Sequence, residues 1–328
     1  MQHALAADGH GRKAAPRVSI IVPAFNSAAC ITACIRSGLE QTERNIEVIV
    51  VDDGSSDGTQ GVIEALAAAD GRIRPFRHSE NQGPGAARNT AIGFARGRWL
   101  ALLDADDAFR PHRLEALCKR AEQSNCDLLA DNLELQDAIT NRSLGLAFPH
   151  HWMAGEQELS LAEFLRRDQP GRVEALEFGF AKPIIRREFI IRTGIRYAPD
   201  LMVGEDFLFY ATCLAHGACF LTYDAAHYLH RIRPGSISRD PAAPEHMSTA
   251  NRRLRECVGE GDAEILALLE CRQNLTSFAA FANAVRMRRY YAAIRTARRM
   301  PKPYLAARLR ELIRHKIAGR PSVTGTST

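Results

Sequence analysis

The chain has 328 residues, of which 46% are hydrophobic and 25% are charged, and its formal net charge is +5. This length gives ample material for a buried core, and the composition is typical of a soluble globular protein. No uninterrupted apolar run reaches the roughly 18 residues that a helix needs to cross a bilayer, so the sequence excludes a membrane-spanning protein.

Strand and helix patterns alternate in the first half of the chain. Runs of β-branched or other apolar residues predict strands at 18–22, 46–51, 99–103 and 127–130, and 73–77 predicts a further short strand. The intervening segments predict helices at 27–41, 56–69, 83–96 and 111–124. This alternation predicts an α/β fold with a mostly parallel, doubly wound sheet. Pro75 marks the third strand as an edge strand, because proline has no N–H to donate to a neighbour.

The rest of the chain is less regular. Residues 132–169 show polar turns without clear periodicity, so we expect an insertion or a loop region there. Residues 218–222 resemble a further strand, and from about residue 244 onward the pattern is helical. The start, through Arg17, is polar and lacks the apolar core of a secretory signal, which predicts a flexible leader and a cytoplasmic protein. The eight cysteines include no Cys-x-x-Cys pair, so we expect buried free thiols.

Two acidic clusters directly follow predicted strands. Asp52 and Asp53 end one strand, and Asp104, Asp106 and Asp107 follow another. In open α/β sheets ligands bind at the carboxyl ends of the strands, so we expect both clusters at one rim. Carboxylates gathered there need a compensating charge, and Mg²⁺ or Mn²⁺ binds such oxygen ligands together with substrate phosphates. For either cluster alone, simple capping of the following helix is an open alternative.

Four motifs in order resemble the family 2 glycosyltransferases. They lie at residues 18–26, 50–59, 81–89 and 104–107, and weaker matches at 204–207 and 231–238 extend the resemblance to about residue 240. That family has a Rossmann-like GT-A fold and moves a sugar from a nucleotide diphosphate to an acceptor hydroxyl with inversion. The resemblance implies a GT-A domain at 18–240, with a nucleotide-binding half (18–131) and an acceptor-binding half (132–240), followed by a helical region at 241–328.

The resemblance assigns roles on the nucleotide side of that rim. Pro23 and Phe25 would form the wall beneath the nucleobase. Asp53 would accept a hydrogen bond from uracil or an equivalent ring, and Asp52 would support the turn. Asp104 would face the ribose and the donor sugar.

The phosphates and the metal have their own candidates by the same resemblance. Asp106 is expected to ligate a metal that bridges the two phosphates, and His230 is a second candidate ligand, with a packed, hydrogen-bonded histidine as the alternative. Arg88, at a helix start, is predicted to bind the phosphate side, against a solvent-exposed arginine as the alternative. Arg231 or Arg233 would donate to the diphosphate from a closing loop.

Asp206 is the predicted general base. Inversion in a single displacement needs a base opposite the leaving group to take the proton of the acceptor hydroxyl. Asp206 matches the aspartate of an acidic dipeptide in the family, with Glu205 beside it. The alternative is that the two acids form the charged first turn of a helix, where the helix dipole favours them.

The C-terminal end carries the basic excess. Between residues 286 and 320 there are twelve basic residues and one acid, Glu311. Apolar residues recur there with helical spacing and predict a basic amphipathic helix, at Leu305, Leu309, Leu312 and Ile313. Such a helix can lie on the anionic inner face of a cell membrane or pack on the core, and both interpretations stay open. No nucleic-acid partner is expected, because aromatic residues are too sparsely interleaved.

The expected function is therefore metal-dependent, inverting glycosyl transfer. The resemblance is to bacterial enzymes of surface-polysaccharide assembly, which implies a nucleotide-sugar donor, with UDP-glucose the first choice, and a lipid-linked oligosaccharide or exopolysaccharide acceptor. The alternative is a non-catalytic sugar-nucleotide-binding or regulatory protein on the same fold. Such a protein would lack the base, so the presence of Asp206 argues against it.

Overall fold

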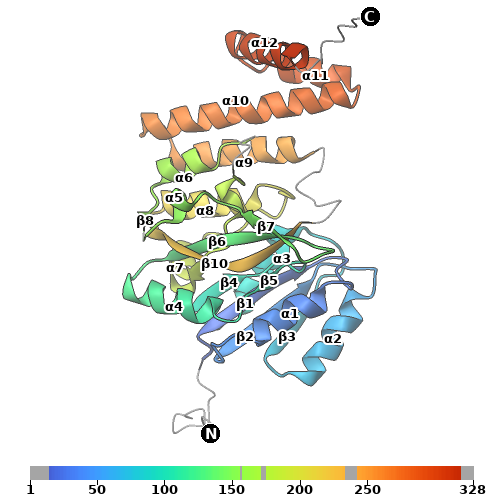
Figure 1. Cartoon of the computed structure of the whole chain (residues 1–328), viewed down its shortest axis with the longest axis vertical. Helices are drawn as coiled ribbons and strands as arrows, with labels where there is room; N and C mark the ends of the chain where they lie inside the picture. Colours follow the sequence, from blue (N-terminus) through green and yellow to red (C-terminus); the bar gives the residue numbers. More distant parts are fainter. Residues whose placement is uncertain (1–14, 156, 171–174, 233–241, 319–328) are drawn as a thin grey trace, which may run out of the picture.

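The computed structural model describes residues 15–155, 157–170, 175–232 and 242–318 (Figure 1). Its centre is a ten-stranded sheet with the order β3-β2-β1-β4-β9-β6-β10-β5, in which β7 pairs with β6 and β8 with β10. The strands are β1 (Val18–Ala24), β2 (Ile46–Asp52), β3 (Ile73–Arg77), β4 (Trp99–Leu102), β5 (Ala108–Phe109), β6 (Leu128–Asp137), β7 (Ser143–Leu146), β8 (Gln157–Glu158), β9 (Ile184–Arg186) and β10 (Phe220–Ile232).

Helices cover this sheet and extend beyond it at one end. They are α1 (Ile31–Leu39), α2 (Thr59–Ala69), α3 (Pro84–Phe94), α4 (Arg113–Gln123), α5 (His150–Met153), α6 (Leu161–Arg167), η1, a 3-10 turn (Phe178–Phe180), α7 (Arg187–Thr193), α8 (Glu205–Ala215), α9 (Ala243–Val258), α10 (Ala263–Arg286), α11 (Tyr290–Ala297) and α12 (Lys302–Ala318). Among the residues described, no helix combines the length and apolarity needed to span a bilayer.

The first half of the sheet is the predicted parallel, doubly wound unit. β1 pairs in parallel with β2 and β4, and β2 pairs in parallel with β3. Every residue of β2 is buried, as expected for a parallel strand covered on both faces, and β3 lies at the edge as Pro75 predicted. The α/β class is confirmed. Beyond β4 the sheet is mixed, because β9 runs antiparallel to both β4 and β6.

The region predicted as an insertion or loops contains regular structure. β6 continues to Asp137 and forms an antiparallel pair with β7, and α5, β8 and α6 follow. The second half of β6 alternates apolar with acidic or amide residues at 133–136, and all but the first of these are only partly buried. A half-exposed strand of this kind is easily taken for polar turns. The expectation of irregular structure was therefore wrong.

The C-terminal helices stack at the end of the molecule opposite the N-terminus (Figure 1). α9 packs on α8, and α10 packs on α9 and α6. A buried ion pair anchors this layer, since Nη1 of Arg272 on α10 lies 2.7 Å from Oδ1 of Asp168, and its guanidinium lies over the Phe207 ring. α9 and α10 therefore pack directly on the rest of the fold. The sequence predicted a boundary between two regions at residue 240.

Two further expectations change in detail. Arg17 was assigned to a flexible leader, but its guanidinium pairs with Glu43 at 2.7 Å and with Glu122 at 2.8 Å. Residues 1–14 of that leader lie outside the described residues. All eight cysteines are free thiols as expected, but Cys257 and Cys271 are exposed, because each lies on the outer face of a C-terminal helix rather than in the sheet core.

Candidate active site

A cavity of about 820 Å³ opens at the carboxyl ends of β1, β2 and β4. It is lined by eight of the residues singled out in the sequence, namely Pro23, Phe25, Asp53, Arg88, Asp104, Asp106, Asp206 and His230. Both acidic clusters contribute to it, as the rule for open α/β sheets predicts. α9 and α10 supply another part of the wall, through Met247 and Thr276 among others. The C-terminal helices thus help to shape the pocket.

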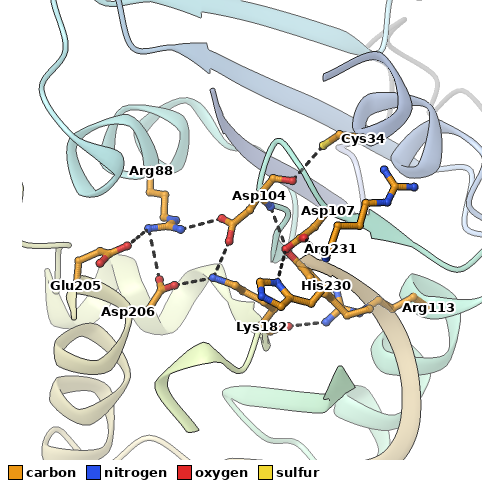
Figure 2. A network of polar contacts seen from close by, with 11 residues as sticks. Cys34, Arg88, Asp104, Asp107, Arg113, Lys182, Glu205, Asp206, His230 and Arg231 are labelled. Atoms are coloured by element: carbon orange, nitrogen blue, oxygen red, sulfur yellow. Dashed lines mark hydrogen bonds and ion pairs between the residues drawn. The ribbon is translucent and has the colours of Figure 1, made fainter. Parts of the chain in front are cut away.

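Two buried cations face three carboxylates inside this cavity (Figure 2). Nζ of Lys182 lies 2.9 Å from Oδ2 of Asp104 and 2.6 Å from Oδ2 of Asp206. Arg88 donates from Nη2 to Asp104 at 2.8 Å and from Nη1 to Glu205 at 2.7 Å. Oδ1 of Asp206 lies 3.5 Å from Arg88 and accepts no hydrogen bond from the described residues.

These pairings set the protonation states in the cluster. Burial alone would raise the pKa of Asp104, but the charges of Lys182 and Arg88 outweigh it and hold the pKa below its ordinary value. Burial would likewise lower the pKa of Lys182, and the charges of Asp104 and Asp206 raise it instead. The pKa of Glu205 is raised by burial and by the adjacent Asp206 charge. Asp104 and Lys182 are therefore held as an ion pair.

The N-terminus of α8 positions the predicted base. Gly204 precedes the helix with φ of +82°, a conformation that residues with a Cβ rarely adopt, and an added Cβ would lie 2.5 Å from Sδ of Met247. Glu205 and Asp206 then form the first turn, where the helix dipole favours negative charge. The alternative interpretation of this dipeptide as a helix start therefore holds alongside its place in the pocket.

Arg88 is not placed as the sequence suggested. It is only 3% exposed, so the solvent-exposed alternative is wrong, and its described charged partners are carboxylates. A phosphate contact would require those carboxylates to release it, so this geometry gives the predicted phosphate role no support. At the same helix start, Gly85 packs closely against protein, because a Cβ there would lie 2.7 Å from the carbonyl oxygen of Ala198.

Lys182 is the functional candidate that sequence reasoning missed. It lies between η1 and β9, and its side chain is 4% exposed. Its backbone carbonyl accepts a hydrogen bond from Arg113, which is fully buried in an ion pair of 2.7 Å with Asp131. A lone charge within the apolar segment 178–185 was the available indication, since a lysine in such a segment is buried only with partners.

Another buried carboxylate, that of Asp107, positions the end of β10 through hydrogen bonds. Asp107 is 1% exposed and accepts hydrogen bonds from Oη of Tyr228 at 2.8 Å and from the backbone N–H of Arg231 at 2.8 Å. It also lies 3.1 Å from Nδ1 of His230. Burial lowers the pKa of His230, but the hydrogen bond and charge of Asp107 outweigh it and raise that pKa. Asp107 therefore orients the histidine ring in the pocket wall.

Comparisons with known proteins now identify the family. The family described as "Glycosyl transferase family 2" matches residues 19–182. The chain belongs to glycosyl transferase family 2. It is 39% identical over 224 residues to the succinoglycan biosynthesis protein ExoO of Rhizobium meliloti (strain 1021). That match covers 68% of this chain and 63% of ExoO, so the chain spans less than two thirds of that relative.

Solved structures share the fold at lower identity. S. aureus TarS 1–349 in complex with UDP-GlcNAc has 21% identity and a TM-score of 0.66, over 85% of this chain and 79% of that one. The mannosyltransferase PcManGT from Pyrobaculum calidifontis, in complex with GDP-Man and Mn²⁺, has 18% identity and a TM-score of 0.58, over 91% of this chain and 80% of that one. The predicted GT-A type of fold is confirmed.

At the end of β2, Asp53 organises a turn in the wall of the cavity. Its carboxylate lies 2.6 Å from Nδ1 of His78 and accepts the backbone N–H groups of Gln82 at 3.0 Å and Gly83 at 2.8 Å. A carboxylate has about four acceptor sites, so capacity for one further donor remains. Phe25, which lines the same cavity, is 43% exposed.

Asp52 and Arg231 are not part of the cavity lining. Asp52 is 1% exposed and accepts the backbone N–H of Ser55 at 3.1 Å, so it supports the turn after β2. Arg231 is absent from the described lining of the pocket. Arg233 lies outside the described residues.

The pocket fits a metal that is shared with a substrate. Asp106 and His230 both line it, and Asp107 holds Nδ1 of the histidine, the second contact that metal-ligating histidines usually make. No group of three or more His, Cys, Asp or Glu side chains within the described ranges could hold a metal alone. Mg²⁺ and Mn²⁺ commonly take one or two protein carboxylates and complete their shell with phosphates and water. The donor set is therefore suited to a metal bound together with a diphosphate.

Proposed function

We propose that this chain transfers a sugar from a UDP-linked donor to a hydroxyl of a lipid-linked saccharide in exopolysaccharide assembly, with inversion at the anomeric carbon. The observation that carries the proposal is the pocket in which Asp206 faces Asp104 across Lys182, at the carboxyl ends of β1 and β4. The shared fold with a UDP-GlcNAc complex and the similarity to a succinoglycan biosynthesis protein support it.

The donor nucleotide binds over β1 and β2. Phe25 and Pro23 supply an apolar surface for the base, and the spare acceptor capacity of Asp53 suits the ring N–H of uracil. The donor sugar then lies toward Asp104. UDP-glucose is the first donor to test, and the contacts to sugar hydroxyls decide among UDP-sugars.

The chemical step is a single displacement in which Asp206 acts as general base. As the acceptor oxygen forms its bond to the anomeric carbon, the bond from that carbon to the diphosphate oxygen breaks and the diphosphate leaves with the electron pair. The proton of the acceptor hydroxyl passes to Oδ1 of Asp206, which accepts no hydrogen bond from the part of the chain that the structure describes, while Lys182 holds Oδ2. Asp106 and His230 would hold Mg²⁺ or Mn²⁺, which would supply Lewis-acid stabilisation of the leaving group.

The acceptor enters from the side of α9 and α10, whose residues line the opposite wall of the cavity. A lipid-linked acceptor stays at the membrane surface, and the acid-poor, basic C-terminal end of the chain suits an anionic surface. Peripheral contact with the inner face of the cell membrane completes the proposal.

Calorimetric titration with UDP, with and without Mn²⁺, tests the donor half, and UDP release in the presence of lipid-linked saccharides tests the transfer. Metal-dependent UDP binding together with acceptor-dependent UDP release is the expected result. Tight UDP binding without release under any acceptor would favour the non-catalytic binding protein. Binding of GDP or TDP in place of UDP would overturn the donor assignment.

A further inference from the structure

α11 turns a small residue toward the protein and its large residues toward solvent. Its Ala293 is buried against the rest of the C-terminal layer, whereas its large residues face solvent. Tyr290 is 61% exposed, Tyr291 83% and Ile294 54%. A surface helix of a globular protein normally turns its large apolar residues inward. Clustered exposed apolar residues of this kind mark an interaction site.

The same corner is strongly and uniformly basic. Residues 285–291, at the junction of α10 and α11, are all exposed, and Val285 and Met287 extend the apolar surface. We call residues 285–299 the α10–α11 corner. Its arginines are exposed and, within the described residues, form no ion pair with an acid; they are Arg286, Arg288, Arg289, Arg295, Arg298 and Arg299. The sequence has no acid at all between Glu270 and Glu311.

α12 is a weaker candidate for the same role. It is the helix whose sequence pattern predicted a basic amphipathic surface, but Tyr304 and Leu305 are half-buried. The Arg308 guanidinium lies over the ring of Phe278 on α10 and pairs with Glu311 at 2.6 Å. The first turn of α12 is therefore partly covered at Tyr304 and Leu305, and the charge of Arg308 is paired, whereas Leu309 is exposed.

We infer that the α10–α11 corner docks on an anionic lipid bilayer, with Tyr290, Tyr291 and Ile294 in the interfacial region and the arginines on the headgroups. Tyrosine is favoured at membrane interfaces, and long arginine side chains reach phosphates while their stems lie on apolar surface. Apolar burial together with attraction to anionic lipid is the combination that holds peripheral proteins on membranes. A second protein copy offers no acidic counterpart at this corner.

The docking surface is also placed to serve the active-site cavity. Thr276 and Ala279 of α10 line that cavity, and α10 ends at Arg286, only about 10 Å further along the helix axis. α10 therefore runs from the cavity wall to the docking surface (Figure 1). The link between docking and catalysis rests on the proposed function, which supplies the lipid-linked acceptor. Such an acceptor, held at the bilayer, would reach the pocket beside α10.

Co-sedimentation with vesicles tests the docking. The full chain should bind vesicles of equal parts phosphatidylglycerol and phosphatidylcholine, not pure phosphatidylcholine, and should release at about 1 M salt, where the Debye length falls to about 3 Å. The triple variant Tyr290→Ser, Tyr291→Ser, Ile294→Ser should bind at least about tenfold more weakly, because it loses the buried apolar area. Two matched controls should bind like the parent: Ile191→Ser on α7, where the isoleucine is 60% exposed, and Leu309→Ser on α12.

Other results would overturn the inference. Parent-like vesicle binding by the triple variant would do so, as would loss of binding in Leu309→Ser with the triple variant unaffected. A parent that is dimeric by light scattering and a triple variant that is monomeric would assign the corner to a second copy. UDP titration of the parent chain separates the two proposals. A parent that binds UDP but not anionic vesicles contradicts the docking alone, and a parent that binds the vesicles but not UDP contradicts the proposed UDP-sugar donor alone.

Discussion

The ammonium of Lys182 lies 2.6 Å from Oδ2 of Asp206, while Oδ1 of that carboxylate accepts no hydrogen bond from the described residues. One oxygen of the proposed base is thus held by Lys182, and the other lies 3.5 Å from Nη1 of Arg88. The same ammonium lies 2.9 Å from Asp104, so it ties the base on α8 to the donor side of the site after β4. Without Lys182, the carboxylates of Asp104 and Asp206 would face each other, and Arg88 would be the remaining described cation that pairs with both.

We therefore expect Lys182→Met to lower the transfer rate about 100-fold, the loss expected when a reacting group shifts by about 1 Å. UDP affinity should change much less, because Lys182 is not on the base-binding side of the cavity. Steady-state UDP release and UDP titration give the two values separately. Lys119→Met, on the exposed face of α4, is the matched control and should behave like the parent. A near-parent rate for Lys182→Met would contradict the positioning role.

Asp206→Asn removes the proposed base while keeping the shape and most of the hydrogen bonding of the side chain. The transfer rate should fall by a factor of about 100 or more, because an amide cannot take the hydroxyl proton. UDP binding, with Mn²⁺ present, should persist. Asp224→Asn, where the aspartate side chain is 48% exposed, controls for the amide change. Loss of UDP affinity with the rate per bound donor retained would show that Asp206 belongs to donor binding instead.

Much of the fold could be predicted from the local sequence pattern. β3 was predicted with the bounds that it has, because an apolar run with one proline permits few other structures. β10 was predicted only at 218–222, yet it runs to Ile232, because its later part is half-exposed and paired to β6 with an irregularity after Tyr223. Pairing between distant strands decides such extensions, and a single sequence does not display it.

The candidate site also combines residues that could be predicted from the sequence with contacts that could not. Strand topology places Asp53 and Asp104 at one cavity, and the motif resemblance indicated Asp206, which lines the same cavity from α8. The partners of charged residues were not predictable, because they depend on which side chains meet after folding. Arg88 pairs with carboxylates rather than projecting to solvent, and Lys182 comes from a segment with no recognised motif.

The revised place of Arg88 leads to a stability prediction. Its guanidinium is buried among Asp104, Glu205 and Asp206, so Arg88→Met should leave uncompensated carboxylates and lower the free energy of unfolding by about 3–5 kcal/mol. Urea denaturation measures this. Arg252→Met, at an exposed i,i+4 pair, should change it by less than about 0.5 kcal/mol. Unchanged stability with weakened UDP binding would restore the phosphate role that the sequence suggested.

Asp106→Ala tests the metal assignment. Mn²⁺ should strengthen UDP binding to the parent, and the variant should lose at least about tenfold of that enhancement, because Asp106 is the carboxylate that we propose to hold the ion beside the diphosphate. Calorimetric UDP titration over a series of Mn²⁺ concentrations measures it. In EDTA the variant and the parent should bind UDP equally, which separates loss of the metal from damage to the nucleotide pocket. Parent-like UDP binding and turnover by Asp106→Ala at limiting Mn²⁺ would remove this residue from the metal site and leave His230 as the remaining assigned ligand.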